Sequence, residues 1–449
     1  MAHSSAPPLL AALLLALTGC ATYRPDPPDL QARPAGSLAE LAPAHAGQGP
    51  LSLAGIGALA IAHNPDLVAV RADHGIAQAQ LDAAGELPNP TLSGSFASVI
   101  SGPGALPALA LGLGQDIKAL IVRPAKVASA RAQLQSVDAA VLWQEWQTAS
   151  KAELTALELV TARRQLALAQ QTVTLWTTHV EHLHNAQQRG DVSLPAFTLD
   201  NTLLADARSQ AAALETLALA RQQELDGLLG LSSAVQLDIA APDDVQPLPA
   251  STITARQEHL VDFRPDLIAL EAGYQAQEQQ VRASVLSQFP ALTLGGNYGR
   301  DTGNVKTAGV DVSMELPLFN HHRAAVSLEQ ATRSKLKAEF EARQRAARNE
   351  LTSLLGQQAL LVRQRDERRQ QMAQSAALLP ALQRAYARGD IDARSYLDTL
   401  SAQNSKAQDL IGLDAALAAS NLAAETLCGL GMPQMQRVQP PLTSTGDRP

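Results

Sequence analysis

The sequence contains one set of landmarks twice, and this duplication limits the folds that the chain can adopt. Three motifs recur in the same order, at a spacing of 199 or 200 residues. They are Asn64-Pro65-Asp66-Leu67 with Arg264-Pro265-Asp266-Leu267, Pro90-Thr91-Leu92 with Pro290-Ala291-Leu292, and Arg189-Gly190-Asp191 with Arg388-Gly389-Asp390. Self-similarity at a fixed spacing indicates repeated structural units. The sequence therefore predicts two copies of one unit, over residues 51–230 and 263–433, joined by a linker over residues 231–262.

The first twenty residues predict export. Ala11 to Leu17 is an apolar stretch too short to span a bilayer, but it has the length of the hydrophobic region of a signal peptide. It ends in Leu17-Thr18-Gly19-Cys20, which resembles a bacterial lipoprotein signal, and the resemblance implies that Cys20 becomes the acylated first residue. The alternative is an ordinary cleaved signal with a coincidental cysteine. Residues 1–19 are thus predicted to be a lipoprotein signal peptide.

The composition favours long packed helices. The chain is 46% hydrophobic but only 3% aromatic, and Ala, Leu, Gln, Arg and Glu dominate it. A net charge of −8 without a basic block argues against nucleic acid as a partner. Cys428 is alone once Cys20 is acylated, so no disulfide framework is predicted. The Pro- and Ala-rich residues 20–50 read as a lipidated linker that does not pack by itself, and residues 434–449 as a tail.

Each predicted unit reads as a helix, two strands and a long helical hairpin. Ser52 to Leu87 favours a helix that Pro88-Asn89-Pro90 ends. The long arms of the hairpins are predicted over Lys126–Gln188 and Arg323–Ala387, and the first could approach ~90 Å at about 1.5 Å per residue. The return arms are predicted over Pro195–Leu229 and Tyr396–Leu427.

The strand pattern alternates between apolar and polar residues. Val310, Val312, Met314 and Leu316 oppose Asp311, Ser313 and Glu315. One explanation is the lipid-out, lumen-in pattern of a transmembrane barrel, with Asp311, Ser313 and Glu315 facing the lumen. The other is a solvated sheet packed on helices. Export favours the barrel, because no transmembrane helix is predicted. Four strands cannot close a barrel, so the chain must oligomerise, and three copies would provide about twelve strands.

These motifs together resemble the TolC family of outer-membrane efflux channels. The resemblance rests on the duplicated Pro-Asp-Leu openings, the run Ala84 to Leu92, Glu315-Leu316-Pro317-Leu318-Phe319 and the two Arg-Gly-Asp turns. The motif Pro88-Asn89-Pro90 is most similar to the heavy-metal branch of this family. The resemblance implies a mainly α fold with a small β part, in which long hairpins form a periplasmic α-barrel and four strands per protomer join a trimeric transmembrane β-barrel.

The resemblance also implies partners and sites. A homotrimer in the outer-membrane lipid, with its helices in the periplasm, would dock a periplasmic adaptor and an inner-membrane efflux pump. The docking tips would be Arg189, Gly190, Asp191 and Ser193 in the first hairpin, and Arg388 and Gly389 in the second. Asp390, Asp392 and Asp398 would line the pore or gate, although Ser395 stands where a second aspartate is common. Asp398 can equally be a solvated helix charge.

The sequence contains no catalytic, cofactor or metal site that we can recognise. No nucleophile with a base in a recognisable order occurs, and Gly55-Ile56-Gly57 follows no strand as a dinucleotide motif would. His179 and His182 have a metal-binding spacing, but no third ligand is evident and a solvated helix face is the simpler explanation. The predicted function is therefore a passive, non-enzymatic outer-membrane conduit for small molecules or metal ions. The alternative is a periplasmic adaptor lipoprotein, which would need only one hairpin.

Overall fold

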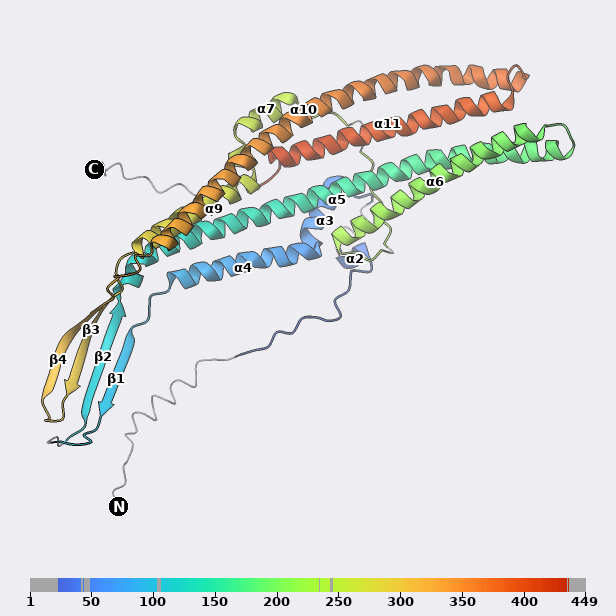
Figure 1. Cartoon of the computed structure of the whole chain (residues 1–449). Helices are drawn as coiled ribbons and strands as arrows, with labels where there is room; N and C mark the ends of the chain where they lie inside the picture. The colour runs from blue at the N-terminus through green and yellow to red at the C-terminus, as the bar shows by residue number, and fades with distance from the viewer. Residues whose placement is uncertain are drawn as a thin grey trace.

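The computed structural model describes residues 23–41, 43, 49–102, 106–233, 235–242, 245–433 and 435. The molecule is elongated, with a small sheet at one end and the tips of two helical hairpins at the other (Figure 1). The first half contains α2 (Leu38–Leu41), α3 (Leu53–His63), α4 (Pro65–Gly85), β1 (Thr91–Ala97), β2 (Ala108–Asp116), α5 (Ile117–Gln188) and α6 (Leu194–Leu229). The second contains α7 (Ala250–Glu258), α8 (Leu260–Phe263), α9 (Pro265–Leu286), β3 (Leu292–Arg300), β4 (Lys306–Met314), α10 (Arg323–Arg388) and α11 (Ala393–Cys428).

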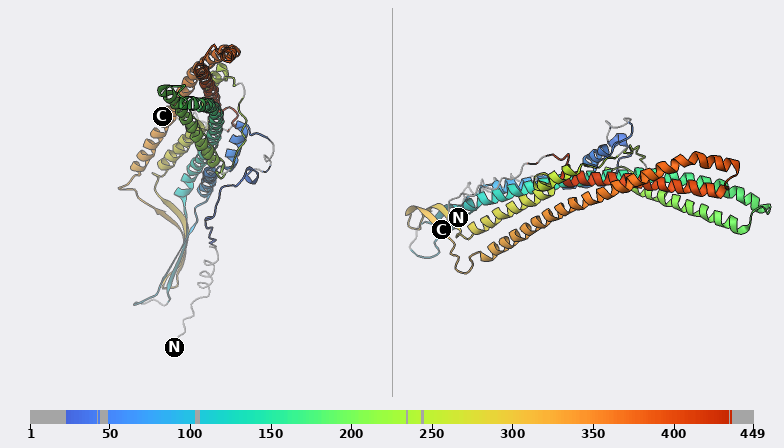
Figure 2. Two further views of the ribbon diagram at one scale, coloured as in Figure 1. Left: turned by 90° about the vertical axis from the view of Figure 1, so that its right-hand side faces the viewer. Right: turned by 90° about the horizontal axis from the view of Figure 1, so that it is seen from above.

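The predicted fold class, mainly α with a small β part, is confirmed. The long arms α5 and α10 have 72 and 66 residues, which corresponds to roughly 108 and 99 Å of helix. The return arms α6 and α11 have 36 residues each. Both hairpins point the same way, and α5 and α10 alone extend from the sheet to the tips (Figures 1 and 2).

Two helix boundaries differ from those that the sequence predicts. The long first arm begins at Ile117 rather than Lys126 and includes Pro124, because the Asp116 side chain caps it by accepting a hydrogen bond from the Ala119 N–H at 3.0 Å. The helix predicted over residues 52–87 is broken into α3 and α4, which bend by 55° at Asn64. Proline disfavours helical dihedrals in the residue before it, and Asn64 has ψ 125°.

Small side chains let α5 approach its neighbours closely. Many of its buried positions are alanine, such as Ala132, Ala139 and Ala152. The hydroxyls of Ser129 and Ser136 each donate to a backbone carbonyl of α9, both at 2.8 Å, which requires the two helices to lie close together. The alanine-rich composition thus corresponds to helices with neighbours on more than one side.

One helix of the described residues, α11, is long and apolar enough to cross a membrane by length and composition. Its best window has a mean hydropathy of 1.2, and 22% of that window is buried. The bent pair α3 and α4 also passes this test when taken together. Because α11 lies along α5 and α10 and carries Asp398, Asp409 and Asp414, we interpret it as an arm of the helical bundle.

The two hairpins end in the same way, in a region that we call the equator. It comprises Leu225–Leu231, Ala424–Leu430 and the segments packed on them. Each return helix stops at a glycine with positive φ, Gly230 at 71° and Gly429 at 64°. Gly230 packs on the His63 carbonyl and Gly429 on the Phe263 carbonyl, each just before a Pro-Asp-Leu helix. The duplicated sequence thus folds into duplicated contacts.

Side chains of the hairpins hold the chain between the two halves against the equator. In the first half, Gln222 donates to the Val235 carbonyl at 2.9 Å. In the second half, Asn421 donates to the Gln246 carbonyl at 2.7 Å. The N-terminal segment is held there too, because the Ala35 N–H donates to Gly230 O and the Ala35 carbonyl accepts from the Ser232 N–H, both at 2.9 Å. The linker that precedes residue 51 therefore packs on the body over part of its length.

The equator contains a carboxylate whose protonation should depend on pH near neutrality. Burial, and then repulsion by Glu425, raise the pKa of Glu153 from 4.5 to about 7. The folded protein then holds a proton that the unfolded chain releases between these values, so stability should fall as pH rises from about 4.5 to 7. Because Glu153 is only partly buried, we expect a fall on the order of 1 kcal/mol.

Unfolding midpoints in urea between pH 5 and 8 test this expectation. Glu153→Gln should flatten the decline between pH 5 and 7. Glu215→Gln, at an exposed position of α6, should leave it unchanged. The same pH profile for Glu153→Gln and the unaltered protein would show that another group is responsible.

Candidate functional site

The four strands form one antiparallel sheet with two chemically different faces. Their order is β1-β2-β3-β4, and β2 and β3 join the two halves of the chain. One face carries Leu92, Phe96, Leu109, Leu111, Leu113, Leu294, Tyr298, Val310, Val312 and Met314. The other carries Thr91, Ser93, Ser95, Gly112, Gly114, Thr293, Asn297, Asp311 and Ser313. The alternation predicted from the sequence thus holds across all four strands.

Both faces and both edges of the sheet are uncovered in the single chain. Leu92, Val310 and Met314 on the apolar face are 69%, 81% and 54% exposed. No described helix covers either face of this sheet, although α5, which follows β2, contacts β3 (Figure 1). The alternative of a sheet packed on helices is therefore wrong for the described residues. Strands β1 and β4 each leave one edge without a partner among the described strands. Unpaired edges of this kind offer a template for pairing with another chain.

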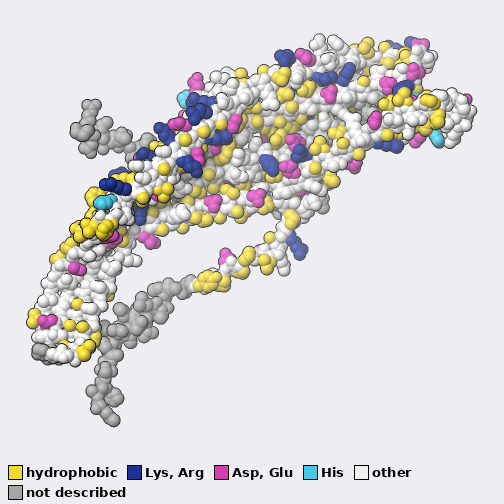
Figure 3. Space-filling view, in the orientation of Figure 1, with side chains coloured by type: hydrophobic (Ala, Val, Ile, Leu, Met, Phe, Trp, Pro, Cys, Tyr) yellow, Lys and Arg dark blue, Asp and Glu magenta, His cyan; other side chains and the backbone are white. Residues whose placement is uncertain are grey.

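The predicted lumen residues lie together on and beside the polar face. Asp311 and Ser313 are on β4, and Glu315 follows its end, where its N–H donates to the Ala291 carbonyl at 2.9 Å. The face seen in Figure 3 shows no Lys or Arg over the strands, whereas these side chains gather along the helices. The polar face is built from small residues, so its side chains would take little of the space inside a closed ring.

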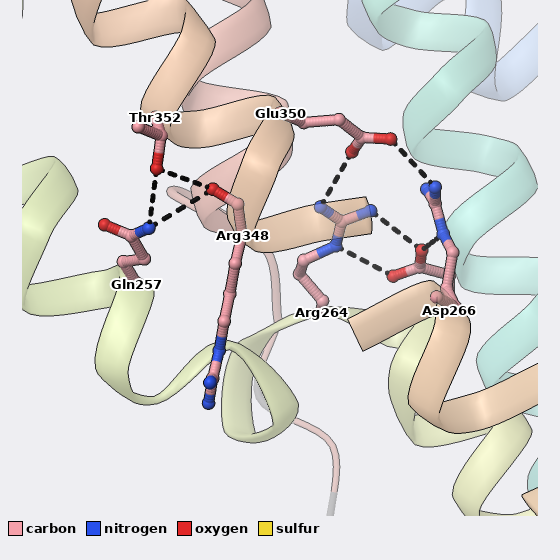
Figure 4. Close-up of polar contacts among 7 residues, drawn as sticks. Gln257, Arg264, Asp266, Arg348, Glu350 and Thr352 are labelled. Atoms are coloured by element: carbon pink, nitrogen blue, oxygen red, sulfur yellow. Dashed lines mark hydrogen bonds and ion pairs between the residues drawn. The ribbon is translucent and has the colours of Figure 1, made fainter. Parts of the chain in front are cut away.

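An ion-pair cluster at the equator fixes α9 against α10 (Figure 4). Arg264, which is fully buried, donates two hydrogen bonds to Asp266 at 3.0 and 2.8 Å, and Arg343 reaches the same carboxylate at 2.8 Å. Glu350 completes the ring through Arg343 at 3.0 Å. Burial acts to raise the pKa of Asp266, but the two arginines outweigh it and lower that pKa. The cluster holds the base of the second hairpin in place.

The two hairpin tips turn through glycine. Gly190 and Gly389 have φ of 82° and 78°, which an L side chain rarely adopts, and no atom lies within 4 Å of an added Cβ at either residue. Each tip carries the same exposed ion pair, Arg189 with Asp191 at 3.0 Å and Arg388 with Asp390 at 2.8 Å. The tips thus present open, chemically similar surfaces.

The remaining predicted tip and gate residues have local roles. Ser193 and Asp392 are the N-cap residues of α6 and α11, and only Asp392 makes a side-chain cap, to the Ser395 N–H at 2.8 Å. Hydrogen bonds from the backbone N–H and the hydroxyl of Ser395 lower the pKa of Asp392. Asp398 is 53% exposed, and its nearest cation is Arg394 at 3.7 Å. Within one chain it is a solvated helix charge.

A contact that the sequence did not predict joins the two hairpins near their tips. Asp200 on α6 is 4% exposed, and its carboxylate contacts Arg394 of α11 at 2.7 Å and His179 of α5 at 3.0 Å. Next to it, the Trp176 indole donates to the Ser401 hydroxyl at 2.9 Å. We call Trp176, His179, Asp200, Arg394 and Ser401 the tip latch.

The prediction of a solvated face was wrong for His179, whose side chain is 12% exposed and paired with Asp200. It holds for His182, which is exposed. Nothing in the sequence distinguishes Asp200 from other helical aspartates, because its partners are brought to it from α5 and α11. The Trp176 position, a large aromatic in an alanine-rich helix, was the one signal that could have pointed to this contact.

An open groove between the hairpins is lined by five glutamines, by Glu367, Arg368 and Asp409, and by small or aliphatic residues. Gln165 and Gln408 exchange hydrogen bonds between side chains and carbonyls across α5 and α11, at 3.0 and 3.3 Å, and Gln210 donates to Gln408 at 2.9 Å. Arg368 pairs with Asp409 in this groove at 3.4 Å. The amides themselves supply neither a nucleophile nor a general base. Among the described residues, no group of three or more His, Cys, Asp or Glu side chains could hold a metal ion. Cys20 lies outside the described residues.

Comparison with known proteins supports the resemblance to the TolC family. Residues 259–430 match the family model described as outer membrane efflux protein. No curated protein sequence matches the chain. The comparisons do not separate one branch of the family from another.

Solved structures of membrane channels share the fold. The outer membrane channel CmeC of Campylobacter jejuni has a TM-score of 0.71 at 16% identity, over 86% of this chain and 87% of that chain. The outer membrane protein VceC of Vibrio cholerae has a TM-score of 0.68 at 18% identity, over 84% and 96%. The outer membrane channel MtrE of Neisseria gonorrhoeae, in its open state, has a TM-score of 0.67 at 17% identity, over 85% and 89%.

Proposed function

We propose that the chain is the outer-membrane channel of an efflux system and works as a passive trimeric conduit. The observation that carries the proposal is the sheet, which has one apolar face, one polar face and two unpaired edges. Closing three such sheets edge to edge would place the apolar faces in lipid, the polar faces around a lumen and no edge in hydrocarbon. The match to the outer membrane efflux family over residues 259–430 supports it.

The helices support the same assembly. Only 22% of the most apolar window of α11 is buried in the single chain, and most residues of this helix are half-buried, so neighbouring protomers would cover it further in a helical tube. The two hairpins continue from the sheet in one direction (Figure 1), which would prolong the lumen into the periplasm. A periplasmic adaptor, the alternative function, is disfavoured because this chain has two hairpins and a membrane-type sheet.

We assign the two tips to docking of the adaptor and pump. Their shared Arg-Gly-Asp turns and exposed ion pairs offer a partner two equivalent surfaces in each protomer. In a trimer, Asp390, Asp392 and Asp398 of the second hairpin would form rings of carboxylates at the periplasmic mouth. The pump would select the exported substrates, whether small molecules or metal ions.

A labelling experiment tests the membrane wall. Cysteine introduced at Leu111, Leu294 or Val312 should react with lipid-soluble maleimide in outer-membrane vesicles, because these residues share the apolar face. Cysteine at Ser93 or Ser313, on the opposite face, should react with water-soluble reagent. Native mass measurement of the detergent extract should give a trimer. Equal labelling of both sets by the water-soluble reagent, or a folded monomer, would contradict the proposal.

We also propose a lipid anchor at Cys20. Followed from α2 back toward the N-terminus, the described residues run away from the equator and toward the sheet end of the molecule (Figure 1). The membrane would lie at that end. Mass spectrometry of the mature N-terminus should find an acylated Cys20, and Cys20→Ala should lose the lipid while the trimer still inserts through its sheet. An unmodified Cys20 in the unaltered protein would remove the anchor and leave the channel untouched.

A further inference from the structure

The apolar face of the sheet ends in a pair of cations. Arg300 is the last residue of β3 and Lys306 the first of β4, and the two are register partners. Alternation places both on the face of Leu294 and Val312, at the end that points away from the helices. Like charges directly opposite each other in an antiparallel pair are destabilising. A negatively charged partner would offset this repulsion.

The protein itself supplies no such partner among the described residues. The apolar face of the four strands carries no acidic side chain. The neighbouring carboxylate, Asp301, is engaged in the turn, where its Oδ1 accepts from the N–H groups of Gly303 and Val305, both at 2.9 Å. Within the described part of the chain, Arg300 donates only to the Pro107 carbonyl, at 3.3 Å, and its buried Nε has no acceptor. Lys306 is exposed.

The surroundings indicate a lipid rather than a dissolved anion. Tyr298 and Leu109, both beside Arg300 on the same face, are 44% and 37% exposed. An aromatic residue next to cations at the end of an apolar band is typical of the level of lipid headgroups. A phosphate there would accept from the planar guanidinium and the ammonium together.

We propose that Arg300 and Lys306 bind the headgroup phosphate of a lipid in the leaflet farther from the helices. This inference rests on the proposed channel function, because it requires the apolar face to contact a membrane. Each protomer contributes one site, so a trimer would hold three lipids around its outer rim. Pairing of neighbouring sheets through their edges would leave these sites open to the membrane.

Native mass spectrometry of the detergent-solubilised full-length trimer tests the proposal. We expect bisphosphorylated lipid A to bind the unaltered protein, and the double variant Arg300→Ala/Lys306→Ala to bind it at least tenfold more weakly, since two charge-assisted contacts are lost. The charge-preserving variant Arg300→Lys/Lys306→Arg should retain binding. Arg189→Ala/Arg388→Ala, which removes two charges at the hairpin tips, should bind as the unaltered protein does. Excess inorganic phosphate should not displace the lipid.

Undiminished lipid binding by Arg300→Ala/Lys306→Ala would overturn the proposal, as would displacement of the lipid by inorganic phosphate. A tryptophan at Val312 separates this failure from failure of the channel. If brominated phosphatidylcholine quenches Val312→Trp while the double variant binds lipid A normally, the membrane wall remains supported and the cation site does not exist. If Val312→Trp is not quenched, the proposed function itself fails.

Discussion

Replacement of Gly429 by alanine should lower the stability of the helical body by about 3 kcal/mol. Gly429 has φ of 64°, a conformation that costs an L residue roughly 1–2 kcal/mol. An added Cβ would also lie 2.5 Å from the Phe263 carbonyl oxygen and 3.1 Å from its carbon. That neighbour is the backbone at the last residue of α8, so it cannot rotate away, and the end of α11 would have to move. Thermal unfolding of the detergent-solubilised trimer, followed by circular dichroism, measures the loss.

Two other glycines provide a graded control. Gly389 has a similar φ of 78° but no atom within 4 Å, so Gly389→Ala should show the backbone cost alone, about 1–2 kcal/mol. Gly230, whose added Cβ would lie 3.0 Å from the His63 carbonyl oxygen, should give an intermediate loss. Equal losses at Gly389 and Gly429 would show that the close approach to Phe263 contributes nothing.

Asp200→Ala should loosen the tips and favour an open conduit. The substitution removes the only carboxylate that both Arg394 and His179 contact, and thus the charge that holds α11 against α5 and α6. Loss of a partner at this depth costs roughly 1–3 kcal/mol, which corresponds to at least a fivefold shift between closed and open tips. Planar-bilayer recordings should show longer openings or higher mean conductance than for the unaltered protein.

Asp206→Ala is the matched control for the latch. It removes the same chemical group from the same helix, α6, but Asp206 is exposed. An exposed helix charge of this kind contributes little to holding the hairpins together, so conductance should stay unchanged. Asp200→Asn should lie between Asp200→Ala and the unaltered protein, because the amide keeps one acceptor. Indistinguishable recordings for Asp200→Ala and Asp206→Ala would mean that the latch does not restrain the tips.

The elements that the sequence predicts well are those whose signal is local. The alternation from Val310 to Met314 depends on the two sides of a single strand, and Gly190 and Gly389 mark turns that each hairpin makes on its own. The strand alternation and the two glycine turns were all predicted at the right positions. The break at Asn64 was missed, although Pro65 is a signal for it. Proline is common at the first position of a helix, and the residues on both sides of Pro65 favour helix, so the sequence was interpreted as one helix.

Contacts between distant segments could not be predicted. His179 was assigned to a solvated face because no third metal ligand is evident in the sequence, yet Asp200 reaches it from α6, and Arg394 of α11 contacts the same carboxylate. Arg264 likewise contacts residues of other helices, Trp143 of α5 and Glu350 of α10, which its own sequence neighbourhood does not indicate. Such positions become visible only when the packing of the hairpins is known.

The unequal lengths of the helices have a consequence for the mechanics of the proposed tube. Toward the tips, α6 and α11 accompany the two long arms, and toward the sheet α4 and α9, of 21 and 22 residues, take their place. Each level of the described wall therefore has four helices per protomer, two continuous and two interrupted at the equator (Figure 1). In the proposed trimer, such a wall would have the same number of helices at both levels and would bend most easily at the equator, where half of its helices end. Displacement at the tips would thus be absorbed at the equator, and the membrane ring would keep its shape.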